Sequence, residues 1–460
     1  APIRRLPQDV LGEIFKLVSC KHPSNNSVGR NGSHSLATLA LSQVCSRWYN
    51  MVVSMPALWS SFQFGSKQLQ KPHPMIPLFL ERSRLHKLSF WINVEHRSTE
   101  DFYDATDFFS TQKTNRWGSV IIHGQRTVLP ATLLRLFLAN GRIFPELRNF
   151  TVRFSDLTLS KSITITCPKL QYLELDRLDV DLKFTQPCHT ANCTDLRGLT
   201  FQHASRILDS FPNVRIIILD IRGDDDFPQC RPLTLHHARI VRIITQKDAS
   251  SRSGFVSSML DTITSPELDH LMLASVRHTE APYVVKSICS LLTRSQARLT
   301  FLTLRRIPFT SRDLTQLLHL LPNLTCLQYK ENSLRKGKFV FRLLKVLTPP
   351  NLRHSLQDGD DDDTDDDYDF GLEQGKLLLP NLQELTVGTC LRKVPLLVNF
   401  LRLRRTLGSS SHLRRLKMDL FNDSHKHVEN KSIAVKFREF EKDGIGISVD
   451  IVDDGDYRLA

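Results

Sequence analysis

The sequence lacks the segments that mark several common protein classes. No stretch approaches the ~18 consecutive apolar residues that a membrane helix needs, and the N-terminal residues do not form a basic-then-apolar secretory signal. Nine scattered cysteines, an odd number without regular spacing, do not form a disulfide framework and favour free thiols in a reducing compartment. We therefore expect a cytoplasmic or nuclear protein without a membrane partner.

Motifs of catalysis are absent as well. The sequence has no P-loop and no G-x-G-x-x-G turn. The tripeptide Asp369–Phe370–Gly371 copies a kinase motif, but the glycine-rich loop and the catalytic-loop motif of kinases are missing. Cys188, His189 and Cys193 have no second ligand pair at matching spacing for zinc. We therefore expect no enzyme activity, no cofactor and no metal site.

Charge is distributed unevenly along the chain. The formal net charge is +13, although residues 358–369 (DGDDDDTDDDYD) are almost all Asp and contain no Lys or Arg. Such a run repels itself and cannot bury apolar surface, so we predict a disordered acidic insertion at about 355–375. The insertion is either a tolerated surface loop or an electrostatic tether or decoy beside a basic face. A basic surface can bind nucleic acid, but most such charge is simply solvated, and we do not expect that partner.

The first 65 residues show helical periodicity. Val10, Leu11, Ile14, Phe15 and Val18 recur at the spacing of one helix face. Residues 19–35 are rich in Ser, Asn and Gly and predict a loop. One continuous second helix is then expected from about residue 40 to residue 55, and residues 57–59 begin a short third element.

From residue 84 onward one motif recurs, apolar-x-x-apolar-x-apolar. Its copies lie at residues 84–90, 146–152, 169–175, 195–201, 213–219, 267–273, 298–304, 323–329, 381–387 and 412–418, with a weaker match at 117–122. Each copy predicts a short strand whose last two apolar residues point into a shared core, while the residues between them face outward. The irregular spacing, with two long gaps, fits leucine-rich repeats in which a copy is missed or interrupted.

Segments between the copies show helical stripes, for example at 284–292 and 314–321. A strand and a helix in each repeat predict a curved solenoid with strands on the concave side and helices on the convex side. Near the end, Ile433, Phe437 and Phe440 predict a further helix. Residues 445–451 alternate strictly between apolar and other residues, which predicts a strand at the edge of the sheet.

Residues 6–62 resemble an F-box domain, in the form abundant in fungal F-box-like proteins. The resemblance is carried by Leu6–Pro7, Val10–Leu11, Ile14–Phe15, Val44–Cys45–Ser46–Arg47–Trp48 and Pro56–Ala57–Leu58–Trp59. The loop at 19–35 is longer than in compact F-boxes. The degenerate repeats resemble the usual continuation in that family. We therefore expect an α/β protein with a three-helix F-box at 1–65, a connecting segment at 66–83 and a curved leucine-rich-repeat-like solenoid at 84–460.

The resemblance implies an adaptor role in ubiquitination. F-box proteins bind a Skp-type adaptor, which joins them to a cullin, and the repeats present a target protein near the ubiquitin-conjugating enzyme, raising its effective concentration there. A module this small leaves part of its apolar surface open to a partner. The expected adaptor-binding residues are Leu6, Pro7, Val10, Ile14, Leu41, Val44, Trp48, Leu58 and Trp59. Leu6, Pro7 and Val44 are expected to face the adaptor, while Trp48 and Trp59 partly serve the core of the module.

Candidate target-binding residues occupy the outward positions of the repeat strands. They are Tyr172, Glu174, Asp176, Asp220, Met272, Arg305, Gln328, Lys330, Arg415 and Lys417. The predicted concave face turns from acidic in the middle to basic near the end, which would steer a partner of opposite polarity. The alternatives are a solvated face without a partner and, for the whole chain, a leucine-rich-repeat interaction scaffold that does not work in ubiquitination.

Overall fold

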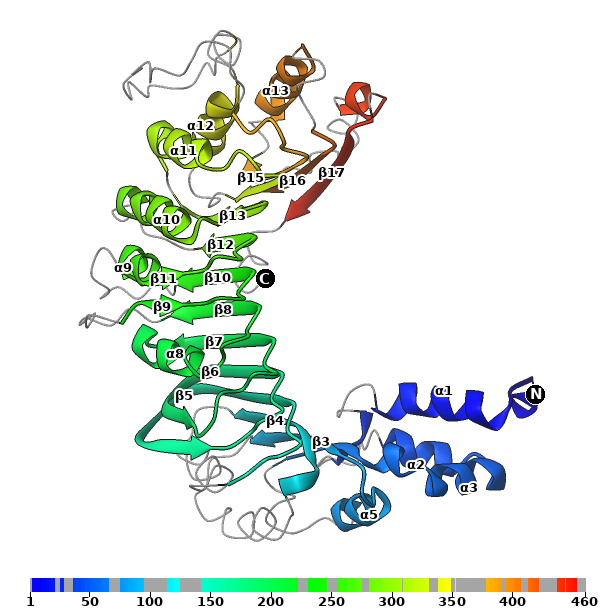
Figure 1. Cartoon of the computed structure of the whole chain (residues 1–460). Helices are drawn as coiled ribbons and strands as arrows, with labels where there is room; N and C mark the ends of the chain where they lie inside the picture. The colour runs from blue at the N-terminus through cyan, green and yellow to red at the C-terminus, as the bar shows by residue number, and fades with distance from the viewer. Residues whose placement is uncertain are drawn as a thin grey trace. The chain divides into compact units, whose positions relative to one another are not determined.

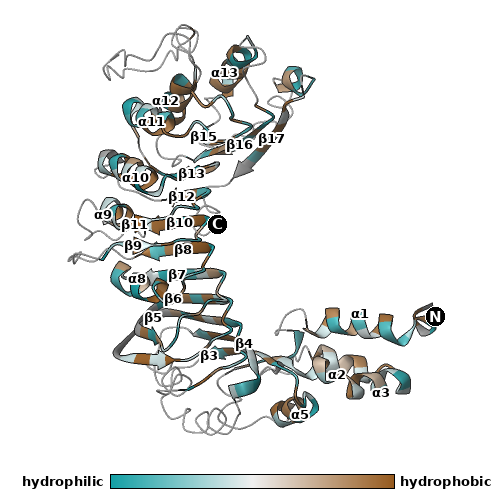
Figure 2. Cartoon of the chain, in the orientation of Figure 1, coloured by the Kyte–Doolittle hydropathy of each residue, from teal (hydrophilic) through white to brown (hydrophobic). Residues whose placement is uncertain are grey.

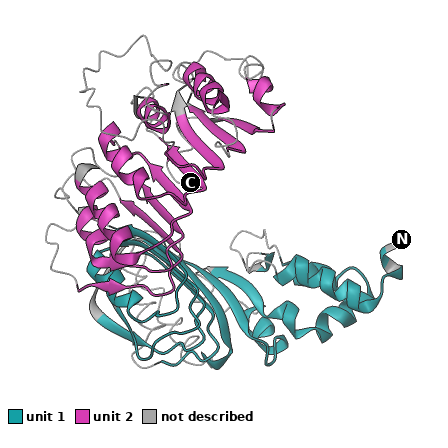
Figure 3. Ribbon diagram, turned by 45° about the horizontal axis from the view of Figure 1, so that its top comes forward, with its two compact units in different colours: residues 1–222 teal, residues 223–460 magenta. Residues whose placement is uncertain are grey.

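The chain forms two compact units, residues 1–222 and 223–460 (Figure 3). The computed structural model describes residues 2–20, 25–28, 36–65, 75–94, 114–124, 142–221, 231–245, 255–274, 281–307, 309–330, 338–348, 352, 378–390, 394–406, 413–421, 437–442 and 444–452. Within these ranges no helix is both long enough and apolar enough to span a membrane. The predicted acidic insertion at about 355–375 lies outside the described residues.

The first unit begins with short helices (Figure 1). They are η1 (Pro2–Arg5), α1 (Gln8–Cys20), α2 (Ala37–Ser42), α3 (Ser46–Ser54), η3 (Pro56–Trp59) and α5 (Met75–Arg82). The prediction of one continuous second helix is therefore wrong, because α2 and α3 are separate. The Ser42 hydroxyl donates to the Leu39 carbonyl at 2.7 Å, and Cys45 is extended with φ −166°. The local hydrogen bond of the Ser42 side chain and the tightened last turn of α2 both favour the end of this helix.

The predicted loop at 19–35 contributes a strand instead of being irregular throughout. Ser27–Val28 forms β1, which pairs in parallel with β2 (Ser61–Gly65). The fully buried Asn26 precedes β1, and its side-chain amide donates to the carbonyls of Ser61 at 2.9 Å and Ser19 at 3.1 Å. Its side-chain oxygen accepts from the backbone N–H of Thr38 at 3.0 Å. This single side chain therefore connects α1, α2 and the first two strands.

The strands of the first unit follow one another in chain order and pair in parallel. After β1 and β2 come β3 (Leu88–Val94), β4 (Trp117–Gly124), β5 (Asn149–Ile165), β6 (Tyr172–Phe184), β7 (Cys193–Leu199) and β8 (Ile216–Ile221). Each repeat copy predicted between 84 and 219 overlaps one of these strands, including the weak match at 117–122. The copy at 195–201 is wrong in its last residue, because β7 ends at Leu199 and Phe201 begins α8. The short helices η5 (Thr114–Arg116) and α8 (Phe201–Leu208) precede β4 and β8.

The second unit repeats this arrangement. Its parallel strands are β10 (Ile240–Thr245), β12 (His270–Ala274), β13 (Phe301–Arg305), β14 (Cys326–Lys330), β15 (Glu384–Cys390), β16 (Arg415–Phe421) and β17 (Gly446–Val452). A two-stranded sheet pairs β9 (Leu233–Thr234) with β11 (Ile263–Thr264). The predicted edge strand at 445–451 is confirmed as β17, the last strand of the order.

Helices alternate with these strands and lie along one side of them in Figure 1. They are α9 (Phe255–Thr262), α10 (Ala281–Ser295), α11 (Ser311–His319), α12 (Lys338–Leu347) and α13 (Val394–Thr406). The stripes predicted at 284–292 and 314–321 are buried faces of α10 and α11. Thr310 and Asp313 form a capping box at the start of α11, which explains where this helix begins. Phe437 and Phe440 lie buried in a helical turn, while Ile433 is outside the described residues.

Register aligns the buried apolar residues of neighbouring strands into columns. In the second unit Leu271, Leu302, Leu327, Leu385 and Leu416 are successive partners, and all are fully buried. The column two residues further along is equally buried. A one-residue slip would turn these residues to the other face, so the apolar pattern fixes the pairing. We call the face that carries these columns the helix-covered face and the opposite one the open face.

Candidate functional site

Helix α1 carries two apolar stripes. Leu11 and Phe15 point into the module and are fully buried. Val10, Leu17 and Val18 are 43%, 66% and 44% exposed. A helix of a self-contained domain normally covers its apolar stripe and exposes polar residues elsewhere. Apolar and polar residues alternate along α1 in Figure 2. The described residues therefore leave apolar surface of α1 open.

The segments beside α1 add to this open surface. Val44, in the turn between α2 and α3, is 58% exposed, and Pro7 is exposed. Arg47 on α3 donates to the Leu6 carbonyl at 2.9 Å, which holds the Leu6–Pro7 segment against α3. The three residues predicted to face the adaptor thus include two that are exposed and one, Leu6, that is half-buried.

Ile14, Leu41 and Trp48 are half-buried and belong to both the core and the surface of the module. The rings of Trp48 and Phe15 meet edge to face with centroids 4.7 Å apart. Such pairs stabilise a core by about 0.5–1.5 kcal/mol beyond their buried area. The expectation that Trp48 serves the core in part agrees with this contact.

Leu58 and Trp59 do not present their side chains to a partner, contrary to the prediction for the adaptor-binding set. Both are fully buried. The Trp59 indole donates to the Val52 carbonyl at 2.8 Å and packs edge to face on Phe79 of α5, with centroids 5.2 Å apart. The Arg82 guanidinium lies 4.5 Å from the Trp59 ring centroid. Because Pro56–Trp59 folds back as a 3-10 turn under α3, these residues join the helices to α5 instead.

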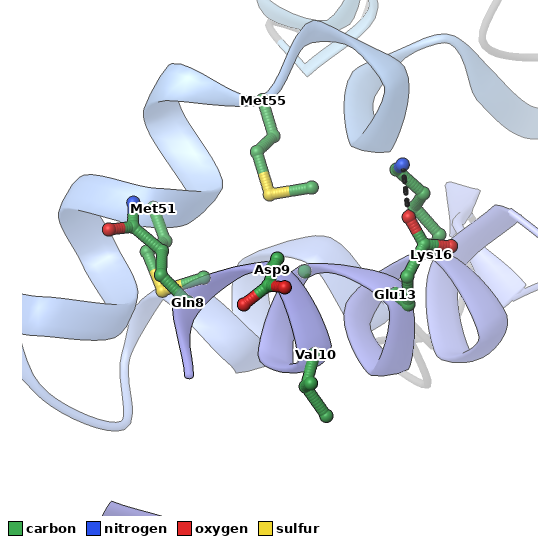
Figure 4. Close-up of a pocket in the computed structure, with 8 residues that line it drawn as sticks. Gln8, Asp9, Val10, Glu13, Lys16, Met51 and Met55 are labelled. Atoms are coloured by element: carbon green, nitrogen blue, oxygen red, sulfur yellow. Dashed lines mark hydrogen bonds and ion pairs between the residues drawn. The ribbon is translucent and has the colours of Figure 1, made fainter. Parts of the chain in front are cut away.

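A groove of about 700 Å³ lies between α1 and α3 (Figure 4). Met51 and Met55 form its apolar part, and Asp9, Glu13 and Lys16 stand along α1. Gly12 lies at its base, where an added Cβ would be 3.2 Å from Met55 Cε. Val10 also lines the groove, although its side chain points away from Met51 and Met55 in Figure 4, so the exposed stripe borders the groove at this residue.

The ten candidate target-binding residues all lie on the open face of their strands. In the first unit Asp176, Arg197 and Asp220 are consecutive partners on β6, β7 and β8. In the second unit Met272, Thr303, Gln328, Thr386 and Lys417 share one row. Arg305 and Lys330 share the next row. The structure therefore brings the candidates of each unit together on one face.

Glu174 is more buried than predicted, with 2% of the residue exposed. Arg153 on β5 donates to both of its carboxylate oxygens, from Nε at 2.6 Å and from Nη2 at 3.0 Å. The Tyr172 hydroxyl donates to the same carboxylate at 3.0 Å, and burial together with that negative charge raises the pKa of Tyr172. The Glu174 carboxylate therefore holds the Arg153 side chain in place, and its negative charge is not available to a partner.

A second pair, missed at the level of sequence, repeats this arrangement on β7. Arg197 donates to the buried Asp195 from Nε at 2.8 Å and from Nη2 at 2.7 Å. The guanidinium side chains of Arg153 and Arg197 remain 45% and 44% exposed. Asp176 lies between them in the row, and burial raises the pKa of its carboxyl. Each exposed arginine on this part of the face is therefore held by a buried carboxylate.

In the second unit Lys330 crosses a neighbouring strand to form an ion pair with Asp419. Gly388 on β15 is the register partner of both residues, and an added Cβ there would lie 3.3 Å from Lys330 Cα and Cβ. The glycine thus leaves room for the lysine to lie flat over β15. Lys417 pairs with Asp450 of β17 at 2.8 Å, and Arg415 pairs with Glu384 at 2.8 Å. Three predicted basic residues are therefore partly neutralised.

Residues 3–59 match the family model of the F-box domain. The match runs from η1 to η3 and thus spans the helices with the exposed apolar stripe. No curated protein matches the chain. The prediction of an N-terminal F-box is confirmed. F-box domains bind Skp-type adaptors, which link them to cullins.

Proposed function

We propose that the chain is a substrate-recognition adaptor of a Skp–cullin–F-box ubiquitin ligase. In this proposal the F-box docks on the Skp-type adaptor and the strand-rich region holds a target protein. The observation that carries the proposal is the apolar surface left open on a module that matches the F-box, formed by Val10, Leu17, Val18 and Val44. The chain acts through these two binding surfaces without catalysing a reaction, in the cytoplasm or the nucleus.

The exposure of these residues supports docking on physical grounds. Full burial of a valine or leucine side chain contributes about 1.5–3 kcal/mol. Four such residues, each more than two-fifths exposed, leave several kcal/mol of burial unused in the free chain. Exposed apolar residues that stand singly need no explanation, but a contiguous set marks an interaction surface. The half-buried Ile14 connects Val10 with Leu17 and Val18, because residues three and four apart are neighbours on a helix surface.

The attachment of the F-box to the first strands supports a role in positioning. Asn26 joins the helices to the sheet through the Ser61 carbonyl, and Thr38 on α2 donates to the Leu58 carbonyl of η3 at 2.8 Å. Phe62 on β2 packs against Phe79 of α5, with ring centroids 5.5 Å apart. The buried hydrogen bonds of Asn26 and the aromatic packing together make a stiff junction. A stiff junction would hold a target in a fixed direction from the docked adaptor.

We further propose that the strands and helices after residue 84 form a leucine-rich-repeat-like solenoid of the degenerate, fungal type. Parallel strands in chain order with aligned leucine columns support this assignment. The open face, with its ordered ion pairs, would then be the concave surface that binds the target. The alternative is an interaction scaffold that carries the F-box without working in ubiquitination.

Affinity purification with mass spectrometry tests the proposal. The intact chain should recover a Skp-type adaptor and a cullin, and a chain without residues 1–65 should lose both while keeping partners of the strand-rich region. The double variant Val10→Asp, Val44→Asp should lose the adaptor, whereas Leu85→Asp should keep it. Leu85 is a matched control because it is 90% exposed and lies in the turn after α5. An intact chain that recovers no adaptor would favour the scaffold alternative.

A further inference from the structure

The open face of β10, β12, β13 and β14 carries basic residues and no acidic ones. Arg242 lies on β10, Arg305 on β13 and Lys330 on β14, and none of the twelve face positions on these strands is Asp or Glu. The first carboxylates on this face are Glu384 on β15 and Asp419 on β16. Lys330 reaches Asp419 across β15, much as each exposed arginine on β5 and β7 has a buried carboxylate partner.

Arg242 forms no ion pair with a carboxylate among the residues that the structure describes. It is half-buried, and no hydrogen-bond acceptor in the described part of the chain reaches its buried Nε. The nearby His270 adds no second positive charge near neutral pH, because burial and the positive charge of Arg242 lower its pKa to about 4. A cation that is partly removed from water without a counter-charge is unfavourable, and a carboxylate from outside would relieve it.

Apolar side chains surround this cation. The ring of His270 lies against Phe301, with centroids 4.1 Å apart, and Met272 and Ala274 lie beside them with 9% and 7% of their surface exposed. Neutral His270 extends the apolar patch because its uncharged ring packs against Phe301 at an interplanar angle of 41°. The patch lies between the strands that carry Arg242 and Arg305.

We propose that this surface, formed by Arg242, His270, Met272, Phe301 and Arg305, binds an acidic segment of a partner protein in extended conformation. Arg242 and Arg305 are separated by two strand spacings and one side-chain repeat, which places their Cα atoms roughly 12 Å apart. Residues i and i+4 of an extended chain point to the same side about 13 Å apart. Carboxylates at these positions would meet the two arginines, and an apolar residue at i+2 would lie on the patch. This inference rests on the proposed function, because it names the class of target for the same face.

Binding of a defined acidic peptide tests the inference. The probe is a fluorescein-labelled synthetic peptide, DGDDDDTDDDYD, and its control carries Asn at every Asp. Fluorescence anisotropy with the full chain should show binding of the acidic probe that is at least tenfold tighter than that of the control. Binding should also weaken between 50 and 200 mM salt, since the contacts are ionic. Equal binding of both peptides would overturn the inference.

Charge variants locate the binding surface. Arg242→Glu should weaken acidic-probe binding at least tenfold, and Arg242→Gln should weaken it less, because Gln removes the charge without reversing it. Lys286→Glu, an equal charge change at an exposed position on α10, should leave binding unchanged. Each variant is checked by thermal unfolding, so that the Gln variant carries the test where the Glu variant fails to fold. Equal losses from Lys286→Glu and Arg242→Glu would refute the assignment to the open face.

A chain without residues 358–369 separates two sources of acidic ligand. The inference expects the probe to bind the full chain and the deletion chain alike, within about threefold. Binding to the deletion chain alone would identify the acidic run of the chain itself as the occupant and overturn the partner assignment. No Skp-type adaptor is present in these measurements. If the chain binds the probe through Arg242 but binds no adaptor, the inference stands and the proposed ubiquitin-ligase function fails. If it binds the adaptor but not the probe, the proposed function stands and the inference fails.

Discussion

Replacement of Asn26 by Ala should loosen the junction between the F-box helices and the first strands. The side chain makes three hydrogen bonds, to the Ser19 and Ser61 carbonyls and from the Thr38 N–H, at 2.9–3.1 Å. All four residues are at most 3% exposed, so the groups left behind have little access to water. An unsatisfied buried group costs about 1–3 kcal/mol. Allowing for local relaxation, we expect a loss of about 3–4 kcal/mol.

Hydrogen exchange measures this loss locally, which suits a chain of two units better than a single unfolding transition. A loss of about 3 kcal/mol corresponds to roughly 100-fold faster exchange, because 1.4 kcal/mol is tenfold. The acceleration should appear in residues 36–42 and 61–65 and spare strand β16. Asn25→Ala is the matched control, since its amide donates to Val18 in an exposed bond and should change exchange less than tenfold. Unchanged exchange around Thr38 would refute the role assigned to Asn26.

Three further variants or conditions test other parts of the structure. Trp59→Ala should lower the stability of the first unit by about 3–5 kcal/mol, because it empties a fully buried aromatic site; differential scanning calorimetry would contradict this with an unshifted transition. Gly388→Val should disturb the second unit, because its side chain would collide with Lys330, and calorimetry should show a loss of about 1–3 kcal/mol there; a neutral effect would mean that the lysine does not need the open space. The depressed pKa of His270, about 4, means that the unfolded chain binds its proton first as pH falls. The stability that the neutral, buried His270 contributes is therefore present above pH 6.5 and is lost as the pH falls from 6.5 to 4. His270→Phe should flatten that part of the curve of stability against pH. An unaltered curve would show that the burial of His270 has no such effect.

The sequence predicts much of the architecture because the repeat motif encodes burial directly. In most copies the last two apolar residues are buried strand residues, and the first is buried in the turn before the strand. Two copies differ. Leu85, the first apolar residue of the copy at 84–90, is 90% exposed, and in the copy at 195–201 Leu196 lies within β7 while Phe201 begins α8. Strand β10 was missed although residues 238–243 follow the same spacing, because its anchor is Ala238 instead of a leucine or valine. A search that allowed any small apolar anchor would have found it. Across the second long gap β14 pairs directly with β15, so no other strand lies between these two in the sheet.

Contacts between distant segments account for most of what the sequence could not predict. Glu174 looked like an open charge because Arg153, 21 residues earlier, meets it only through the register of β5 and β6. Asn26 lies in a polar stretch typical of a loop, and its importance depends on two groups, at Thr38 and Ser61, from elements further along the chain. Trp59 could be assigned to neither core nor surface until Phe79 and Arg82 were placed beside it.

The central claim is that the exposed apolar stripe of the F-box binds a Skp-type adaptor. Isothermal titration of the purified adaptor into the chain measures it directly. The account predicts saturable one-to-one binding, weakened at least about 100-fold by Val10→Asp with Val44→Asp, because two apolar contacts of at least 1.4 kcal/mol each are replaced by charges. Leu85→Asp should bind as the natural chain does. An affinity that the double variant leaves unchanged would contradict the account, as would a natural chain that binds no adaptor.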